Sequence, residues 1–188
     1  FVYVHKEADL DIAIDIIING KSKISACNAV DKVLIDEKLP NKDAFIKKLI
    51  SKLNATKIEV LGDAIVSKNH KLIEISSNEV WYEEFLDYKI VIGQIASNED
   101  AITMINKYAG GHSSAIITKD IDKAKLFMEN VDTAVVYHNA STRFTDGGQL
   151  GLGGELAIST DKLHQRGPIG LQHLVTNKWY VHGNGQTR

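Results

Sequence analysis

Cys27 is the one cysteine in the sequence, and its thiol is the strongest potential nucleophile. It lies among the small residues Ser25, Ala26 and Asn28. A thiolate in such a turn, close to backbone N–H groups, would have a lowered pKa and would share those groups with a developing oxyanion. The alternative interpretation is a small buried hydrophobic residue, which describes most lone cysteines. The residues alone leave both interpretations open.

Arg143 is a second candidate for chemistry because it lies in a polar loop beside Ser141 and Thr142. Its planar guanidinium is suited to a carboxylate or a phosphate, to which it can donate two parallel hydrogen bonds. The alternative is an ordinary surface arginine. Arg143 is therefore a candidate ligand for an anionic substrate.

Three well-known motifs for binding phosphate, dinucleotides or metal ions are incomplete in this sequence. Gly20-Lys21-Ser22 resembles the end of a phosphate-binding loop, but the first glycine of that pattern would fall on Asp15. Gly151-x-Gly153 lacks the third glycine of a dinucleotide fingerprint, since position 156 is Leu. The seven histidines show no i, i+4 pair, so we expect no metal site.

The elements that must position these residues follow from apolar spacing. An amphipathic helix is predicted from Ala8 to a stop at Gly20, with a strand over 30–35 and a helix after Pro40-Asn41. Further strands are predicted at 1–4, 57–61, 89–95, 112–118 and 133–138, and helices at 98–108 and 120–130. Such alternation indicates an α/β fold with a mostly parallel sheet flanked by helices. Cys27 then falls in a turn between a helix and a strand.

The character of the sequence changes after residue 138. Residues 139–170 form a Gly-rich region, which is typical of a binding or catalytic loop, although a plain connector is the alternative. Residues 171–175 and 178–182 read as two strands, which predicts a C-terminal β-hairpin within 171–188 that serves as an arm for a neighbouring domain or subunit. We expect three parts, 1–138, 139–170 and 171–188.

Composition excludes several function classes. The 188 residues are 44% hydrophobic and carry a formal charge of -2, which argues against nucleic acid as a partner. No apolar run approaches the ~20 residues of a membrane span. A single cysteine excludes an intrachain disulfide and favours a reducing compartment, so we expect a cytoplasmic protein. Because the chain opens on Phe1 within a strand-like run, we expect a fragment that starts inside a fold.

A family resemblance emerges from longer stretches taken together. These are Ala26-Cys27-Asn28-Ala29, the run from Asn139 through Asn-Ala-Ser-Thr-Arg-Phe-Thr-Asp-Gly-Gly to Gly148, Gly151-Leu152-Gly153, Lys162-Leu163-His164-x-Arg166-Gly167-Pro168, Lys178-Trp179 and Gly183-x-Gly185-Gln186. In order and over nearly the whole chain, they resemble the γ-glutamyl phosphate reductases of the aldehyde dehydrogenase superfamily. Asp31, where members often carry Glu, and Gly154, where Ala is frequent, are small departures.

The resemblance implies an activity. Members reduce L-γ-glutamyl phosphate with NADPH to L-glutamate-5-semialdehyde and phosphate, the second step of proline biosynthesis, through a thioester on the cysteine that aligns with Cys27. It also implies a C-terminal catalytic part of a longer enzyme whose N-terminal cofactor domain is mostly absent, so we expect the chain alone to be inactive. The resemblance further implies that the enzyme forms a homo-oligomer, has glutamate 5-kinase as a functional partner and does not associate with a membrane.

The resemblance also implies roles for particular residues. Asn28 and the Cys27 N–H lie near the oxyanion, and Glu84 matches the carboxylate that holds the nicotinamide ribose, with Glu83 as the alternative. The implied substrate-binding residues are Asn139, Ser141, Thr142, Arg143 and Phe144. His112 and Arg166 are weaker candidates.

Three other hypotheses stay open at this stage. The chain could act only as a folding and oligomerisation module, or serve another acyl-phosphate or aldehyde dehydrogenase of the superfamily. A Cys-dependent hydrolase would need a histidine base, and none is close to Cys27 in the sequence.

Overall fold

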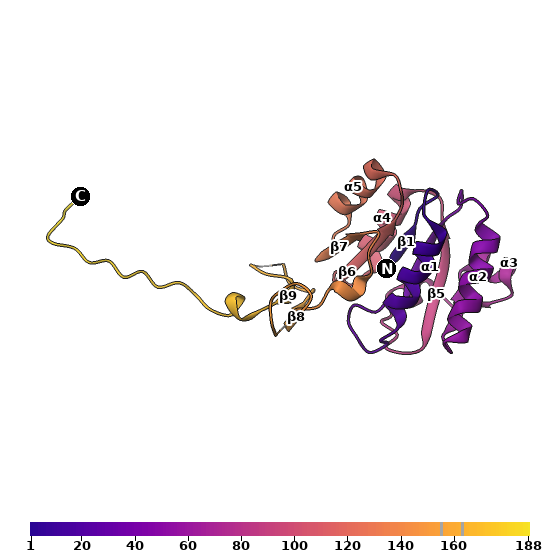
Figure 1. Ribbon diagram of the computed structural model, residues 1–188, viewed down its shortest axis with the longest axis horizontal. Coiled ribbons are helices and arrows are strands. Elements are labelled where there is room, and N and C mark those ends of the chain that lie inside the picture. The colour runs from indigo at the N-terminus through magenta and orange to yellow at the C-terminus, as the bar shows by residue number, and fades with distance from the viewer. Residues whose placement is uncertain (155, 163) are drawn as a thin grey trace.

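A computed structural model describes residues 1–154, 156–162 and 164–188. Its centre is a parallel sheet in the order β4-β3-β5-β2-β1-β6-β7 (Figure 1). The strands are β1 (Val2–Val4), β2 (Lys32–Asp36), β3 (Glu59–Gly62), β4 (Ile73–Glu74), β5 (Lys89–Ile95), β6 (Ser113–Ile117) and β7 (Val135–His138). The predicted parallel α/β sheet is confirmed.

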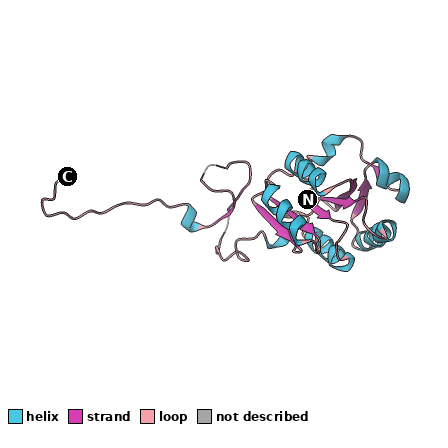
Figure 2. Ribbon diagram, turned by 90° about the horizontal axis from the view of Figure 1, so that it is seen from above, coloured by secondary structure: helices cyan, strands magenta, loops and turns pink. Residues whose placement is uncertain are grey.

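Helices cover both faces of this sheet (Figure 2). They are α1 (Leu10–Lys21), α2 (Lys42–Ala55), α3 (Ala64–His70), α4 (Asn98–Tyr108) and α5 (Ile121–Asn130). Short 3-10 turns are η1 (Asn78–Trp81), η2 (Thr142–Phe144) and η3 (Leu171–His173). The predicted strand 89–95 and helix 98–108 have the observed bounds, whereas α3 and β4 were not predicted.

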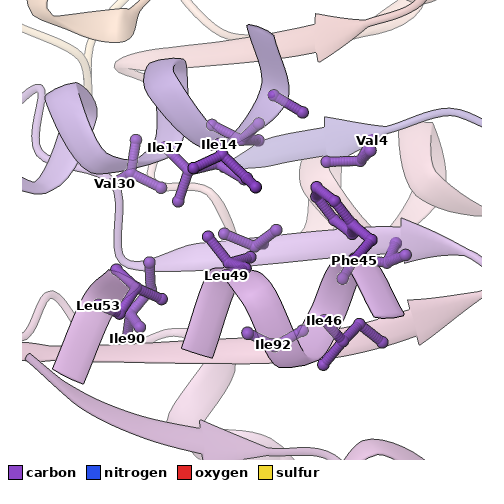
Figure 3. Packing of buried hydrophobic residues seen from close by; sticks show 14 of the residues in the cluster. Val4, Ile14, Ile17, Val30, Phe45, Ile46, Leu49, Leu53, Ile90 and Ile92 are labelled. Atoms are coloured by element: carbon purple, nitrogen blue, oxygen red, sulfur yellow. The ribbon is translucent and has the colours of Figure 1, made fainter. Parts of the chain in front are cut away.

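Two apolar cores follow from alternation along the strands. Val33 and Ile35 of β2 face α1, α2 and α3, while Leu34 faces α4 and α5. A parallel sheet buried on both faces therefore needs nearly continuous apolar strands, as β2 and β5 have. Figure 3 shows the first core, where Leu49 of α2 lies among side chains of α1 and the sheet.

The end of α1 differs from its prediction. Gly20 lies inside the helix, which continues to Lys21, rather than at its stop. A Cβ at Gly20 would overlap the Val30 side chain, so Gly20 allows the chain that leaves the Cys27 turn to pack against the helix. Gly20 is thus needed for close packing, and the turn that carries Cys27 is held tightly to α1.

The predicted hairpin is present, but at a different place. β8 (Leu156–Ile158) and β9 (Gly167–Ile169) pair antiparallel, within the region predicted as loop. Residues 171–188 contain η3 and no strand, and they extend away from the α/β body (Figures 1 and 2). The prediction of strands at 171–175 and 178–182 is wrong: these segments pair with no strand among the described residues, and their apolar side chains are exposed.

Among the described residues, no helix has the length and apolar character that crossing a membrane would require.

Candidate active site

Cys27 lies at the amino-terminal edge of the parallel sheet, in the turn between α1 and β2, and its side chain is exposed. It lines a pocket of about 240 Å³. Lys32 and Ser113, the first residues of β2 and β6, line the same pocket. The pocket therefore opens where neighbouring parallel strands begin, and strands far apart in the sequence contribute to it.

The structure brings Glu84 and His112 into this pocket with Cys27. Glu83 lines it too, so the two adjacent carboxylates remain alternatives. His112 is 8% exposed and directly precedes β6. The family resemblance implied that Cys27 and Glu84 belong to one site, which periodicity alone does not show, because these residues meet only when β2, β6 and the segment before β5 are assembled.

Charge in the pocket is predominantly acidic. Asp31, Glu83 and Glu84 contribute carboxylates. Among the described lining residues, the basic side chains are those of Lys32 and His112. Such a lining favours hydroxyl donors and cationic groups over a phosphate or a carboxylate.

Lys32 is buried, with 1% of its surface exposed. Burial lowers the pKa of its amine from 10.5 to about 8, although nearby Asp31 acts in the opposite direction. Lys21, equally buried, lies with its Nζ 2.5 Å from an oxygen of Asp31. Neither lysine was predicted as a site residue. The available signal was a lysine opening the otherwise apolar run that becomes β2.

Asn28 links the Cys27 turn to the segment around η2. Its side-chain amide donates to the carbonyl of Thr145 at 2.8 Å and accepts from the guanidinium of Arg143. Its own carbonyl accepts from the Thr142 hydroxyl at 2.6 Å. Asn28 is 4% exposed, so its side chain anchors the residue next to Cys27.

Asn139 and Ser141 make local contacts. Asn139 has a positive φ of 51°, and its amide both donates to and accepts from the backbone of Thr118. Ser141 caps η2 by accepting a hydrogen bond from the N–H of Arg143. These contacts set the backbone path of the residues that follow.

Arg143 and Phe144 line a separate depression of about 390 Å³ together with Asn19, Ser22 and Asp146. Arg143 reaches the Cys27 turn through its bond to Asn28. Half of Phe144 is exposed. Of the predicted substrate residues, Arg143 and Phe144 therefore line a different depression from the pocket that Cys27 and Glu84 line.

Arg166 lies away from both depressions. Its guanidinium bonds Asp132 at 2.9 Å and the carbonyl of Thr133 at 2.9 Å, which attaches the β8–β9 hairpin to the chain before β7. Leu163, part of the segment that carries the resemblance, is outside the described residues. Among those described, no three His, Cys, Asp or Glu side chains are grouped as metal ligands.

Comparisons with known sequences and with solved structures find relatives of the same kind. A γ-glutamyl phosphate reductase of Clostridium botulinum (strain Eklund 17B / Type B) is 47% identical over all 188 residues, which cover 45% of that protein. The crystal structure of the Thermotoga maritima γ-glutamyl phosphate reductase superposes with a TM-score of 0.91 at 38% identity, over all of this chain and 45% of that one. The chain thus spans about half the length of the curated relatives it matches.

A more distant structure shares the fold. A glyceraldehyde-3-phosphate dehydrogenase of Methanocaldococcus jannaschii, crystallised with NADP, has a TM-score of 0.57 at 23% identity over 75% of this chain and 39% of that one. The family model described as the aldehyde dehydrogenase family matches residues 76–179. With its parallel sheet, its pocket at Cys27 and these matches, the chain belongs to the aldehyde dehydrogenase family.

Proposed function

We propose that this chain provides the nucleophile-bearing part of an NADPH-dependent γ-glutamyl phosphate reductase. The reaction is γ-glutamyl phosphate + NADPH + H⁺ → glutamate-5-semialdehyde + phosphate + NADP⁺. The observation that carries the proposal is the exposed Cys27 in a pocket with Glu84, in a chain that matches reductases of this name over its whole length. A role in proline biosynthesis, with glutamate 5-kinase as the enzyme that supplies the substrate, follows from that substrate.

Cys27 is the proposed nucleophile. Its thiolate attacks the acyl carbon, the bond to the phosphate oxygen breaks, and a thioester remains on Sγ. Phosphate is a good leaving group, so this step needs little acid catalysis. After reduction, the tetrahedral carbon collapses to the aldehyde and returns the thiolate. The Cys27 N–H is the proposed oxyanion donor, and Asn28 supports it by fixing the turn, since its amide is bonded to the η2 segment.

The Cys27 pocket fits the nicotinamide end of the cofactor. Glu84 and Glu83 present acceptors for ribose hydroxyls, and an acidic lining suits a ring that becomes cationic. Bound NADPH supplies the hydride. We propose Glu84 as the cofactor-binding residue. The structures of relatives with NADP bound support a nicotinamide cofactor.

The substrate's anionic groups are proposed to lie on the η2 side. Arg143 offers a guanidinium there, in a depression outside the acidic pocket. Phe144 lines the same depression, and Ser141 caps η2 beside it. Asn139 and Thr142 are proposed to act by holding the backbone, since their side chains are bonded to Thr118 and Asn28. Opposite charges on the two sides would hold the cofactor's ribose and the substrate's anionic groups on different sides of Cys27.

The remaining context is also proposed. A single cysteine used as a nucleophile is best kept reduced, so we place the enzyme in the cytoplasm. The exposed apolar residues of 171–188 are proposed as an arm that assembles a homo-oligomer, and the Gly-rich residues 139–170 as the substrate and cofactor loop region.

Replacement of the thiol tests the proposal. In the full-length protein that carries this chain, Cys27→Ser is expected to abolish NADP reduction with glutamate-5-semialdehyde and phosphate, because a serine alkoxide is almost unpopulated near neutral pH. Ser25→Ala, an exposed change in the same turn, serves as the matched control and should retain activity. Activity of Cys27→Ser above a few per cent of wild type would exclude the thioester route. Wild-type activity with other acyl phosphates but not this one would assign a different substrate.

A further inference from the structure

The segment that carries the pocket carboxylates has no regular structure. Between η1 and β5, residues 82–88 form neither helix nor strand, and Glu83 and Glu84 are exposed. Backbone without such structure must be held by other contacts if a side chain on it is to keep one position.

Two hydrogen bonds hold this segment on either side of Glu84. The Lys32 amine donates to the carbonyl of Glu83 at 2.7 Å. The N–H of Phe85 donates to a carboxylate oxygen of Asp31 at 3.0 Å. Lys32 is the first residue of β2 and Asp31 directly precedes it, so both anchors lie where this strand begins. The residue left between them is Glu84.

The anchors are themselves fixed. The other oxygen of Asp31 lies 2.5 Å from the Lys21 amine, so each carboxylate oxygen has a partner. The Lys32 ammonium lies 3.6 Å from the centre of the Phe85 ring, a cation–π contact in addition to its hydrogen bond. Charges this deeply buried are unfavourable unless directional contacts compensate them, and these contacts all converge on one short segment.

We propose that Lys32 and Asp31, held by Lys21, are positioning residues that fix Glu84 at the Cys27 pocket. The inference rests on the proposed function, in which Glu84 binds the nicotinamide ribose. Lys32 and Asp31 act through Glu84: they fix the backbone on both sides of it and leave its carboxylate to face the pocket.

Steady-state kinetics of the full-length protein test this role. Lys32→Met removes the donor and the charge while keeping the length of the side chain. We expect its KM for NADPH to rise by about tenfold, the scale of one charge-assisted hydrogen bond, with a smaller change in kcat. Lys32→Arg, which keeps a charged donor, should recover most of the loss. Lys89→Met is the matched control, because Lys89 also lies near the Phe85 ring, at 5.7 Å, but bonds Glu59.

A double variant separates positioning from general destabilisation. If Lys32 acts through Glu84, Lys32→Met combined with Glu84→Gln should be no worse than Glu84→Gln alone. If the two substitutions raise the KM for NADPH by factors that multiply in the double variant, or if Lys32→Met lowers only kcat, the proposal is overturned.

A second measurement is independent of catalysis. A spin label on Glu84→Cys, in a Cys27→Ser background of the 188-residue chain, is a single probe because the chain has one cysteine. Lys32→Met should increase the mobility of the label, whereas Lys89→Met should not. An equally immobile label in folded Lys32→Met would refute the positioning role, and Lys32→Arg repeats the comparison if that variant does not fold. Absence of reductase activity in the wild type would refute the proposed function alone, since the label still reports on the anchors.

Discussion

At the scale of residues, Cys27 and the adjacent Asn28 have different surroundings. Cys27 is exposed to its pocket, while Asn28 is buried and bonded to Arg143, Thr142 and Thr145. Buried amides that are fully hydrogen-bonded hold a single geometry, because breaking one bond leaves an unsatisfied group. Asn28 therefore fixes the backbone next to Cys27, and a change in the η2 segment should alter the position of the Cys27 thiol.

Arg143→Lys is expected to lower kcat/KM of the full-length enzyme by more than tenfold. An ammonium cannot reproduce both the contact to Asn28 and two parallel donors toward an anion, and one lost charged hydrogen bond corresponds to about 1.5–3 kcal/mol. Steady-state kinetics measure the effect, with Arg188→Lys at the exposed chain end as control. An unchanged kcat/KM would show that Arg143 is an ordinary surface arginine.

The lowered pKa of Lys32 predicts a pH dependence of stability. Below pH 8 the Lys32 amine is charged in both the folded and the unfolded state, so burying the charge lowers the free energy of unfolding by its full amount. Between pH 8 and 10.5 the folded state has released the proton and the unfolded state has not, so stability rises with pH. The wild type should gain about 2 kcal/mol relative to Lys32→Met between pH 7 and 10.

Urea unfolding of both proteins across that range measures the difference, which removes contributions common to them. Tyr3 limits the range at its upper end: burial raises its pKa, so ionisation of the unfolded state lowers stability above pH 10. A difference that stays constant from pH 7 to 10 would contradict the lowered pKa.

At the scale of elements, the pocket forms at the amino-terminal edge of the sheet. Ligands in open parallel sheets usually bind at the carboxyl ends of the strands. Here β2 and β6 contribute residues at their beginnings, and the segment before β5 contributes the carboxylates. The carboxyl ends of β1 and β2 instead carry an internal bond, from the Tyr3 hydroxyl to Asp36 at 2.9 Å.

The C-terminal segment predicts an assembly effect. Leu174, Trp179 and Val181 are 64%, 87% and 87% exposed, which is unusual for apolar side chains unless a partner covers them. Deletion of residues 174–188 from the full-length protein should reduce its oligomeric mass in light scattering while the melting temperature of the α/β body changes little. An unchanged mass would exclude the arm from assembly.

At the scale of the whole molecule, this chain contains the proposed nucleophile but only part of the proposed cofactor site. The pocket offers one or two carboxylates for the proposed contact to a ribose, and the described residues contain no glycine-rich dinucleotide fingerprint. One charged hydrogen bond contributes about 1.5–3 kcal/mol, whereas even millimolar affinity needs about 4 kcal/mol.

The 188-residue chain by itself should therefore bind NADPH too weakly to saturate at millimolar concentration, while a thiol reagent still labels Cys27. Calorimetric titration and labelling kinetics on the same preparation check both halves. Micromolar binding would mean that the Gly-rich region between 147 and 154 contributes to the cofactor site.

Much of the framework could be predicted from the sequence, because it depends on local periodicity. Continuous apolar runs such as Ile90–Ile92 identify strands buried on both faces, and polar caps such as Ser97 and Asp120 mark where helices begin. The helix and strand on either side of Cys27 follow in the same way, and the residue motifs point to the family.

Only the tertiary structure decided which side chains meet. His112 and Glu84 reach the Cys27 pocket because the segments that lead into β6 and β5 meet at one edge of the parallel sheet, which no local pattern encodes. The predicted strands after Leu171 were wrong because an apolar pattern forms a strand only where a partner strand or surface covers it. The hydrogen bonds on either side of Glu84 were not predicted, since a lysine at the start of a strand is ordinarily solvated and only packing buries Lys32 against Phe85.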